Sequence, residues 1–251
     1  MILVRDHKTV RELQLNRPPA NALNLELMTE LRRAVEAAPR DGVRALVLSG
    51  RPGMFSAGLD IPLLLTLDRN AISDLWRSLY SLLRSLASSP IPIAAAITGH
   101  APAGGTVLAI FCDWRIVAEG DWKIGLSEVQ VGLPLPPIIF LALRRLVSAQ
   151  QAQQLATRGL LVSPAQALQV GLVDHIVPPD QVVSAAIDWC ETLLALPQNA
   201  AAYTRREARA DLTEIFAQDR TRELEELSAA WWEPETHSVL RQMAERLKNK
   251  K

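Results

Sequence analysis

The 251-residue sequence lacks the features that mark several large classes of protein. It has only two cysteines, Cys112 and Cys190, and both lie in apolar segments, so we expect buried free thiols and no disulfide framework. Its four histidines have no partners at the spacing of metal ligands. No apolar run approaches the ~20 residues of a transmembrane helix. The charges balance, 27 basic against 27 acidic, which argues against nucleic acid or a membrane surface as a partner.

Two further absences concern targeting and repetition. The first ten residues have the rhythm of a strand and not the layout of a signal peptide. No internal repeat or low-complexity segment occurs. We therefore expect a cytoplasmic, bacterial-type protein, with the mitochondrial matrix as the alternative if the chain is a processed form.

Strand and helix signals alternate along most of the chain and predict an α/β fold with a mainly parallel sheet. The expected strands are Met1–Val4, Val10–Leu15, Val43–Leu48, Ile91–Ile97, Asp113–Glu119 and Val173–Val177. Helices are expected from Leu25 with Asn24 as N-cap, over 72–86, 106–111 and 138–147, after Ser148 and Ser163, and from Pro178–Asp180 onward.

The last quarter of the chain is helical in rhythm and rich in charge. Residues 1–198 thus form one predicted unit and residues 199–251 a second, helical one. The charged groups Arg205–Glu207 and Arg222–Glu226 are interpreted as solvated helix faces. The second unit also contains apolar residues that need cover, which suggests subunit contacts: Leu212, Ile215, Phe216, Leu224, Leu227, Trp231 and Trp232.

Two glycine-containing loops follow predicted strands, where open α/β sheets place their ligands. In the first loop, 51–60, Gly58 permits close approach of a backbone, and Leu59 can present its N–H group. In the second, Gly99, Pro102, Gly104 and Gly105 punctuate a tight loop that opens a helix. The free N–H groups of such a loop suit an anion or a developing negative charge.

Glu128 follows the second loop in an otherwise apolar setting, GLSEVQVGLP. One carboxylate and one loop lined with N–H groups are the parts needed to abstract a proton next to a carbonyl group. A lone Gly-Gly pair is more often a simple turn, and a lone Glu is usually a solvated surface residue. The functional interpretation therefore depends on the rest of the chain.

With both loops and the glutamate in place, the sequence resembles the crotonase (enoyl-CoA hydratase/isomerase) superfamily. The matching segments are NRPPANALNLELM, VRALVLSGRPGMFSAGLDI, PIAAAITGHAPAGGTVLAIFCDWRIVAE, IGLSEVQVGL and SPAQALQVGLVDHIV. They run in order from about Asn16 to Val177. Within the superfamily, these motifs are most similar to those of the mitochondrial-type Δ3,Δ2-enoyl-CoA isomerases.

This resemblance implies a crotonase-like spiral of ββα units. Residues 1–198 would be the catalytic core, and 199–251 a C-terminal helical trimerisation region that builds homotrimers or dimers of trimers. It also implies an acyl-CoA thioester as the bound molecule. By the same resemblance, the backbone N–H groups of Leu59 and Gly104 form the oxyanion hole. Ala57, Gly58, Leu59, Asp60 and Ile61 would hold the bent CoA, and Ser127 would line the site, where related enzymes tend to have Asn.

The family's hydratases use two glutamates. Glu128 matches the second, whereas the first falls on Val107, which cannot transfer a proton. We therefore expect a Δ3,Δ2-enoyl-CoA isomerase of fatty-acid β-oxidation, with Glu128 as its acid and base and a pKa raised by Val129, Val131 and Leu133. This reaction requires neither a metal nor a redox cofactor. Coenzyme A is part of the substrate and is therefore not counted as a cofactor.

Several interpretations stay open at this point. Another crotonase reaction, such as hydration, thioester hydrolysis or decarboxylation, is one alternative. A non-catalytic acyl-CoA-binding subunit is another. The acyl pocket is expected to involve Trp76, Leu79 and Leu135, and His100, beside the second loop, is expected to be structural.

Overall fold

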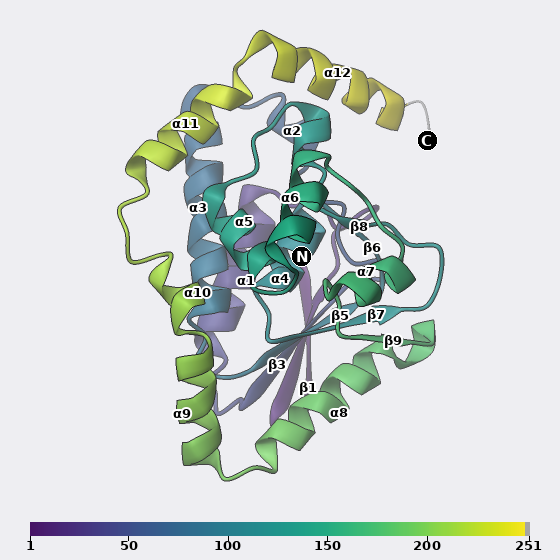
Figure 1. Ribbon diagram of the computed structural model, residues 1–251, viewed down its shortest axis with the longest axis vertical. Coiled ribbons are helices and arrows are strands. Elements are labelled where there is room, and N and C mark those ends of the chain that lie inside the picture. The colour runs from purple at the N-terminus through teal and green to yellow at the C-terminus, as the bar shows by residue number, and fades with distance from the viewer. Residues whose placement is uncertain (249–251) are drawn as a thin grey trace.

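The computed structural model describes residues 1–248, and the chain in it winds as a spiral of repeated strand–strand–helix units (Figure 1). Each unit starts with a strand of a large sheet, continues into a short strand of a small sheet, and then enters a helix. The three units are β3–β4–α2/α3, β5–β6–α4 and β7–β8 with the helical turn that follows. This arrangement confirms the predicted α/β fold of ββα units.

Two sheets carry the spiral. The large sheet has the strand order β1 (Ile2–His7), β2 (Val10–Leu15), β3 (Ala45–Ser49), β5 (Ile93–Ile97), β7 (Trp114–Ala118) and β9 (His175–Val177). The small sheet consists of β4 (Gly53–Met54), β6 (Gly99–Pro102) and β8 (Ile124–Gly125). All pairings are parallel except the β1–β2 hairpin, in which His7 lies opposite Val10.

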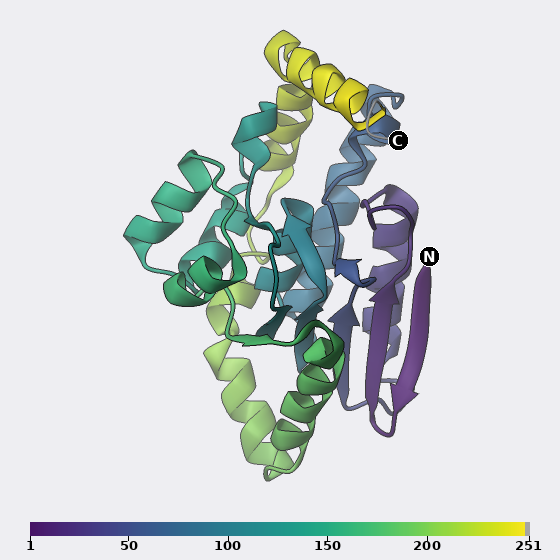
Figure 2. The ribbon, with the colours of Figure 1, turned by 90° about the vertical axis from the view of Figure 1, so that its right-hand side faces the viewer.

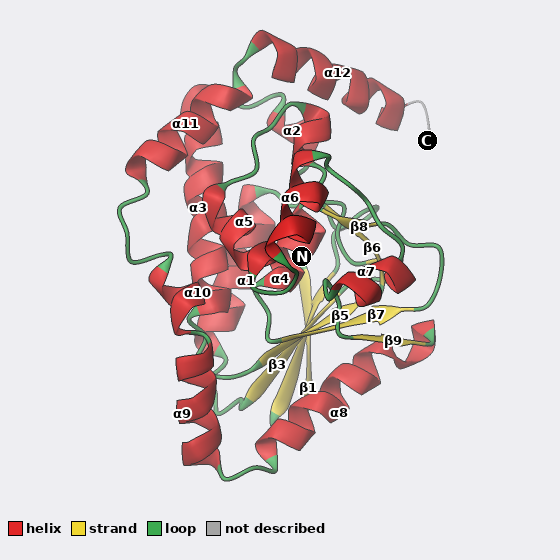
Figure 3. Ribbon diagram, viewed as in Figure 1, coloured by secondary structure: helices red, strands yellow, loops and turns green. Residues whose placement is uncertain are grey.

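Helices surround the sheets (Figure 3). The first part of the chain forms α1 (Leu25–Ala37), α2 (Ile61–Leu64), α3 (Arg69–Ala87), α4 (Gly104–Ile110), α5 (Pro137–Arg144), α6 (Ala149–Thr157), α7 (Pro164–Val170) and α8 (Val182–Leu194). The C-terminal part forms α9 (Gln198–Ala208), α10 (Ala210–Glu214), α11 (Thr221–Trp231) and α12 (Pro234–Lys248). Two 3₁₀ turns, Glu128–Val131 and Pro179–Gln181, complete the regular structure. None of the described helices is both long and apolar enough to cross a membrane.

The helix starts follow the capping signals in the sequence. The Asn24 side chain accepts the N–H of Leu27 at 2.9 Å and so caps α1, as predicted. Ser148 and Ser163 each form a capping box with a glutamine three residues later, Gln151 and Gln166. These local bonds satisfy N–H groups that would otherwise be unpaired at the helix ends.

Strand β5 shows how the sheet separates two layers of the core. Its sequence IAAAI alternates between faces, because successive side chains of a strand point to opposite sides. Ile93, Ala95 and Ile97 belong to the main core with α1 and α3. Ala94 and Ala96 face α8 instead, together with Ala186 and Cys190 of that helix, and their small side chains let the helix lie close to the sheet. Both cysteines are free and buried, as expected.

The C-terminal helices α9 to α12 follow one another along one side of the molecule (Figures 1 and 2). The sequence suggested that their apolar residues would need a partner subunit for cover, and for several of them this was wrong. Leu212, Leu227 and Trp231 are buried inside the chain, since α10 and α11 pack against α3. These side chains therefore need no second subunit to remove them from water.

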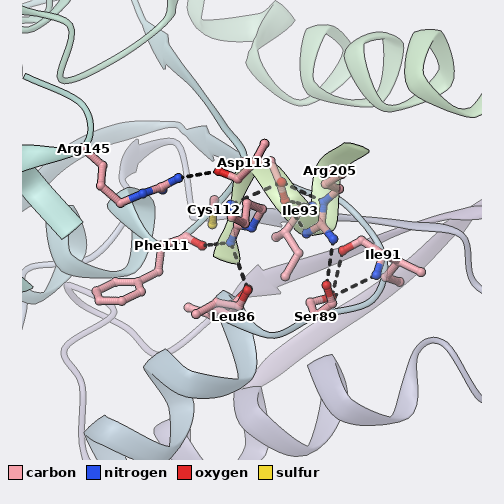
Figure 4. Close-up of polar contacts among 12 residues, drawn as sticks. Leu86, Ser89, Ile91, Ile93, Phe111, Cys112, Asp113, Arg145 and Arg205 are labelled. Atoms are coloured by element: carbon pink, nitrogen blue, oxygen red, sulfur yellow. Dashed lines mark hydrogen bonds and ion pairs between the residues drawn. The ribbon is translucent and has the colours of Figure 1, made fainter. Parts of the chain in front are cut away.

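Arg205 also departs from its predicted place on a solvated helix face. Its guanidinium pairs with Asp113 at 2.8 Å and donates to the carbonyl oxygen of Ser89 at 2.8 Å (Figure 4). Arg209, buried nearby, pairs with the same carboxylate at 3.2 Å. The neighbouring Arg206 and Glu207 are exposed, as predicted. Helical periodicity alone cannot reveal a buried partner some 90 residues earlier in the chain.

Candidate active site

Gly58 and Gly104 bring the two glycine loops into direct contact. A Cβ atom on Gly58 would lie 2.9 Å from the backbone nitrogen of Gly104, and one on Gly104 would lie 2.9 Å from the Cα of Gly58. Real Cβ contacts are essentially never that short, and Gly58 also has a φ of +84°. Only glycine at both positions permits this approach. It places the segment Ala57–Ile61 beside the start of α4.

The N–H group of Leu59 is left free by the loop that contains it. Each neighbouring N–H from Phe55 to Ile61 has an acceptor: those of Phe55, Ser56, Ala57, Asp60 and Ile61 donate to carbonyl oxygens, and that of Gly58 donates to the Ser56 hydroxyl. Within residues 1–248, Leu59 N–H has no such partner. Leu23 explains this, because it donates to the Gly58 oxygen at 2.7 Å and accepts from the Asp60 nitrogen at 2.9 Å. Leu59 N–H then points away from Leu23.

The start of α4 supplies a second free N–H group. Ala103, its N-cap, has a φ of +48° and a ψ of −119°, a conformation that a residue with a Cβ rarely adopts. Its own N–H donates to the Gly125 oxygen at 2.7 Å, which helps to hold this strained backbone. The next N–H, on Gly104, has no acceptor among the described residues. Strained backbone of this kind is concentrated at functional sites.

Glu128 begins the 3₁₀ turn that follows β8. Gly132 ends the turn in a left-handed conformation, and the Leu133 N–H donates to the Glu128 carbonyl oxygen at 3.1 Å. The Oε2 atom of Glu128 is buried and has no hydrogen-bond partner in the part of the chain described. Because burial penalises the charged carboxylate, the pKa of Glu128 rises from 4.5 to about 7. A perturbed acid in a cavity is a candidate for proton transfer.

All these groups meet at one cavity of about 400 Å³. Its walls include Leu59, Gly104, Ser127 and Glu128, together with an apolar group: Leu23, Ile61, Trp76, Leu79, Val107, Val131, Leu133, Pro136, Ile139 and Leu161. Glu128 is the only carboxylic acid among the described lining residues. The cavity thus combines two free N–H donors, one acid with a raised pKa and a long apolar wall.

Most of the site residues predicted from the sequence line the cavity, and a few do not. Ala57, Leu59, Ile61, Gly104, Ser127 and Glu128 all line the cavity, and so do Val107, Trp76 and Leu79. Gly58 and Asp60 do not line it: Gly58 packs on Gly104, and Asp60 pairs with Arg17 at 2.6 Å and caps α2. Leu135 packs against the core, and Pro136 takes the expected place in the wall.

One neighbouring expectation also changes, and another agrees with the structure. Val129, expected to bury Glu128, is 39% exposed, and Val107 lies in the wall instead. His100 does not line the cavity. Its Nδ1 accepts the Lys123 N–H at 3.1 Å, and its ring packs edge-on against Trp122. The expectation that His100 is structural agrees with these contacts.

No sequence pattern predicted that α12 would reach the site. Val239, Gln242, Met243 and Arg246 of this helix line the cavity. The turn after Glu128 holds α12 in place, because the Thr236 hydroxyl donates to the Gly132 oxygen at 2.8 Å. A contact across about a hundred residues leaves no local pattern. Helix α12 therefore forms part of the wall of the cavity in its own chain.

The sequence of this chain also matches known proteins. A profile of the enoyl-CoA hydratase/isomerase family matches residues 5–250. The chain belongs to this family. The mitochondrial enoyl-CoA delta isomerase 1 of Homo sapiens is 33% identical over 245 residues, which are 96% of this chain and 81% of that protein. A probable enoyl-CoA hydratase of Mycobacterium avium is 35% identical over 213 residues, 84% of this chain and 81% of that protein.

The fold of this chain also matches that of a solved structure. The crystal structure of the human mitochondrial Δ3-Δ2-enoyl-CoA isomerase superposes with a TM-score of 0.95 and 32% sequence identity, covering 100% of this chain and 99% of that one. This confirms the crotonase-like fold. Because related family members include both isomerases and hydratases, membership shows a crotonase-type protein, and the choice of reaction depends on the site.

Proposed function

We propose that this protein is a Δ3,Δ2-enoyl-CoA isomerase, which shifts the double bond of a 3-enoyl-CoA to give the 2-trans-enoyl-CoA, as β-oxidation requires for unsaturated fatty acids. One observation carries the proposal: among residues 1–248, a single carboxylic acid, Glu128, lines a largely apolar cavity together with two residues whose backbone N–H groups have no partner. An isomerase needs one group to move a proton between two carbons, and donors for the oxygen that becomes negative.

The reaction has two proton transfers. The Glu128 carboxylate takes a proton from C2 of the thioester, and the electron pair moves onto the carbonyl oxygen to form a dienolate. The N–H groups of Leu59 and Gly104 donate to that oxygen. Protonated Glu128 then delivers the proton to C4, the double bond moves to C2–C3, and the carboxylate is restored.

Each part has an energetic role. The α-proton of a thioester is weakly acidic, so donors to the enolate oxygen matter most, and losing one such donor typically raises the barrier by ~3 kcal/mol. A pKa of about 7 leaves Glu128 divided between its two protonation states at neutral pH. It can therefore act as base at C2 and as acid at C4. No step calls for a metal or a redox cofactor.

Val107 favours isomerisation over hydration. This residue is 2% exposed and lines the cavity with Glu128. A hydratase shares the positioning of water and the delivery of a proton between two carboxylates, and an apolar side chain can do neither. A dry wall also protects a dienolate from water. Hydration is accordingly the second candidate, supported by the mycobacterial relative.

The assembly is proposed on the family resemblance: homotrimers or dimers of trimers. Light scattering of dilute protein tests it, and a stable species of about the chain's 27.6 kDa would contradict it.

The test of the function itself is incubation of the pure protein with 3-hexenoyl-CoA and with crotonyl-CoA, with identification of each product. Formation of 2-hexenoyl-CoA supports the proposal. Binding of both compounds without turnover would favour a non-catalytic acyl-CoA-binding subunit.

A further inference from the structure

A short segment before α1, residues 16–23, forms a backing for the loop that carries Leu59. The Ala57 N–H donates to the Ala20 oxygen at 3.0 Å, and the Ser56 hydroxyl donates to the Asn21 oxygen at 2.8 Å. Leu23 then brackets Leu59 through its bonds to Gly58 and Asp60. The two segments are therefore joined at nearly every residue from Ser56 to Asp60.

Asn21 fixes the shape of this backing segment. It is fully buried with a φ of +50°, a conformation that asparagine tolerates better than most residues. Its side-chain amide donates to the Phe55 oxygen at 3.0 Å and the Met54 oxygen at 3.2 Å. Its Oδ1 atom accepts the N–H of Arg17 at 2.9 Å. Asn21 thus ties the backbone of Arg17 to the start of the loop at Met54 and Phe55.

Arg17 closes the contact at the end nearest Leu59. One arm of its guanidinium donates to the Asp60 Oδ2 atom at 2.6 Å, and the other donates to the Ala22 oxygen at 2.9 Å. The side chains of Arg17 and Asp60 are 23% and 14% exposed, so water screens this pair only in part. The second oxygen of Asp60 accepts the Leu63 N–H at 3.2 Å and caps α2. The residue directly after Leu59 is thereby held from two sides.

We propose that Arg17 is a positioning residue for the reaction: through Asp60 it sets the direction of the Leu59 N–H that receives the developing negative charge. This inference rests on the proposed function, because it assigns Arg17 a role in that same site. Arg17 does not line the cavity, so it acts through the loop and not by contact with substrate. One N–H on each terminal nitrogen of its guanidinium is engaged, with Asp60 and with Ala22, and these two bonds turn the side chain toward the loop that carries Leu59.

The direction of the effect follows from hydrogen-bond geometry. An N–H···O bond weakens steeply as its angle falls. Removing one oxyanion donor lowers kcat by about 10²–10³. Loosening such a donor should cost less than removing it, so Arg17→Ala is expected to lower kcat about 30-fold. The KM should change less than 3-fold, because the bond matters most in the transition state.

The test combines kinetics with the vibration of the bound thioester. The probe is hexanoyl-CoA labelled with ¹³C at the thioester carbonyl, which has no double bond to move. In the intact protein, two N–H donors should shift its infrared carbonyl band to lower wavenumber. Arg17→Ala should lose at least half of that shift, and Arg17→Lys should keep more of it, since Lys retains the charge opposite Asp60 but not the second arm.

Arg11→Ala is the matched control. Arg11, like Arg17, has a partly buried guanidinium with acceptors on two residues, here the carboxylates of Asp6 and Asp41, but it lies on the β1–β2 hairpin and does not line the cavity. This variant should show the intact band shift and kcat. Asp60→Asn should behave like Arg17→Ala, because both changes break the same contact between Arg17 and Asp60. The kcat of the double variant should be no lower than that of the less active single variant.

The outcomes separate this inference from the proposed function. Arg17→Ala with the full band shift and a kcat within 3-fold of the parent overturns the role of Arg17. A full band shift with a Kd for hexanoyl-CoA raised 10-fold also overturns it and makes Arg17 a ligand contact. If the intact protein itself shows no shift, the oxyanion hole of the proposed function fails. Should Arg17→Ala not fold, Arg17→Lys and Asp60→Asn carry the same test.

Discussion

The hydroxyl of Thr236 donates to the carbonyl oxygen of Gly132 at 2.8 Å, and this bond joins the first turn of α12 to the turn that begins with Glu128. Gly132 has a φ of +76°, and a Cβ there would lie 3.0 Å from the Cα of Thr236. A side chain at residue 132 would therefore require Thr236 to move back by a few tenths of an ångström. The C-terminal helices and the site are coupled at this point.

Gly132→Ala should displace α12 from the cavity wall. The positive φ alone is expected to lower the free energy of unfolding by about 1 kcal/mol. Gly42→Ala is the matched control, since Gly42 has a φ of +82° and open space around its Cβ position. We expect Gly132→Ala to be less stable than this control by roughly a further 1 kcal/mol in urea unfolding. Only Gly132→Ala should raise the KM for 3-hexenoyl-CoA; equal KM values would show that α12 does not shape the site.

The sequence predicted the framework of the site better than its closure. The two glycine loops and Glu128 were recognisable because close backbone approach needs glycine, and these residues lie in local motifs. The small sheet was missed: Gly99–Pro102 looked like a loop but forms β6, because a strand this short has too few residues to show alternation. Arg17 and Asn21 lie in the family-like segment NRPPANALNLELM. Their partners, Asp60 and Phe55, are visible only in three dimensions.

Glu128→Gln should abolish turnover while binding persists. The change keeps the shape of the side chain and removes its ability to accept a proton. The kcat for 3-hexenoyl-CoA should fall at least ~10³-fold. The Kd for hexanoyl-CoA, measured by calorimetry, should stay within a few-fold. Near-normal isomerisation would show that another group moves the proton, although the carboxylate of Asp60 is already engaged by Arg17.

The raised pKa of Glu128 also predicts how activity depends on pH. Only the carboxylate can take the C2 proton, so kcat/KM should rise with pH through an apparent pKa near 7. The same titration affects stability. The folded state binds this proton more tightly than the unfolded state does, so the stabilisation is complete below pH 4.5 and is lost as pH rises through 7.

Glu128→Gln removes this titration and so gives a second readout. The free energy of unfolding of the variant minus that of the parent should increase by about 2–3 kcal/mol between pH 5 and pH 8. Urea unfolding at the two pH values measures it, and the comparison cancels all other titrating groups. A difference that does not change with pH would mean that Glu128 has an ordinary pKa in the folded protein.

The last prediction concerns Val107, which faces the same cavity as Glu128 from α4. Hydration of crotonyl-CoA requires a water held at C3 and a proton delivered to C2, and a hydratase shares these tasks between two carboxylates, whereas Val107 is apolar. Hydration should therefore be slower than isomerisation of 3-hexenoyl-CoA by at least two orders of magnitude. In deuterated water, part of the C2 proton should reappear at C4, because one shielded acid carries it across. Val107→Glu should raise hydration at least ~10-fold by adding the missing carboxylate, whereas Val107→Thr, which keeps the shape without an acid, should not. Comparable hydration and isomerisation rates in the parent protein would exclude the single-acid mechanism.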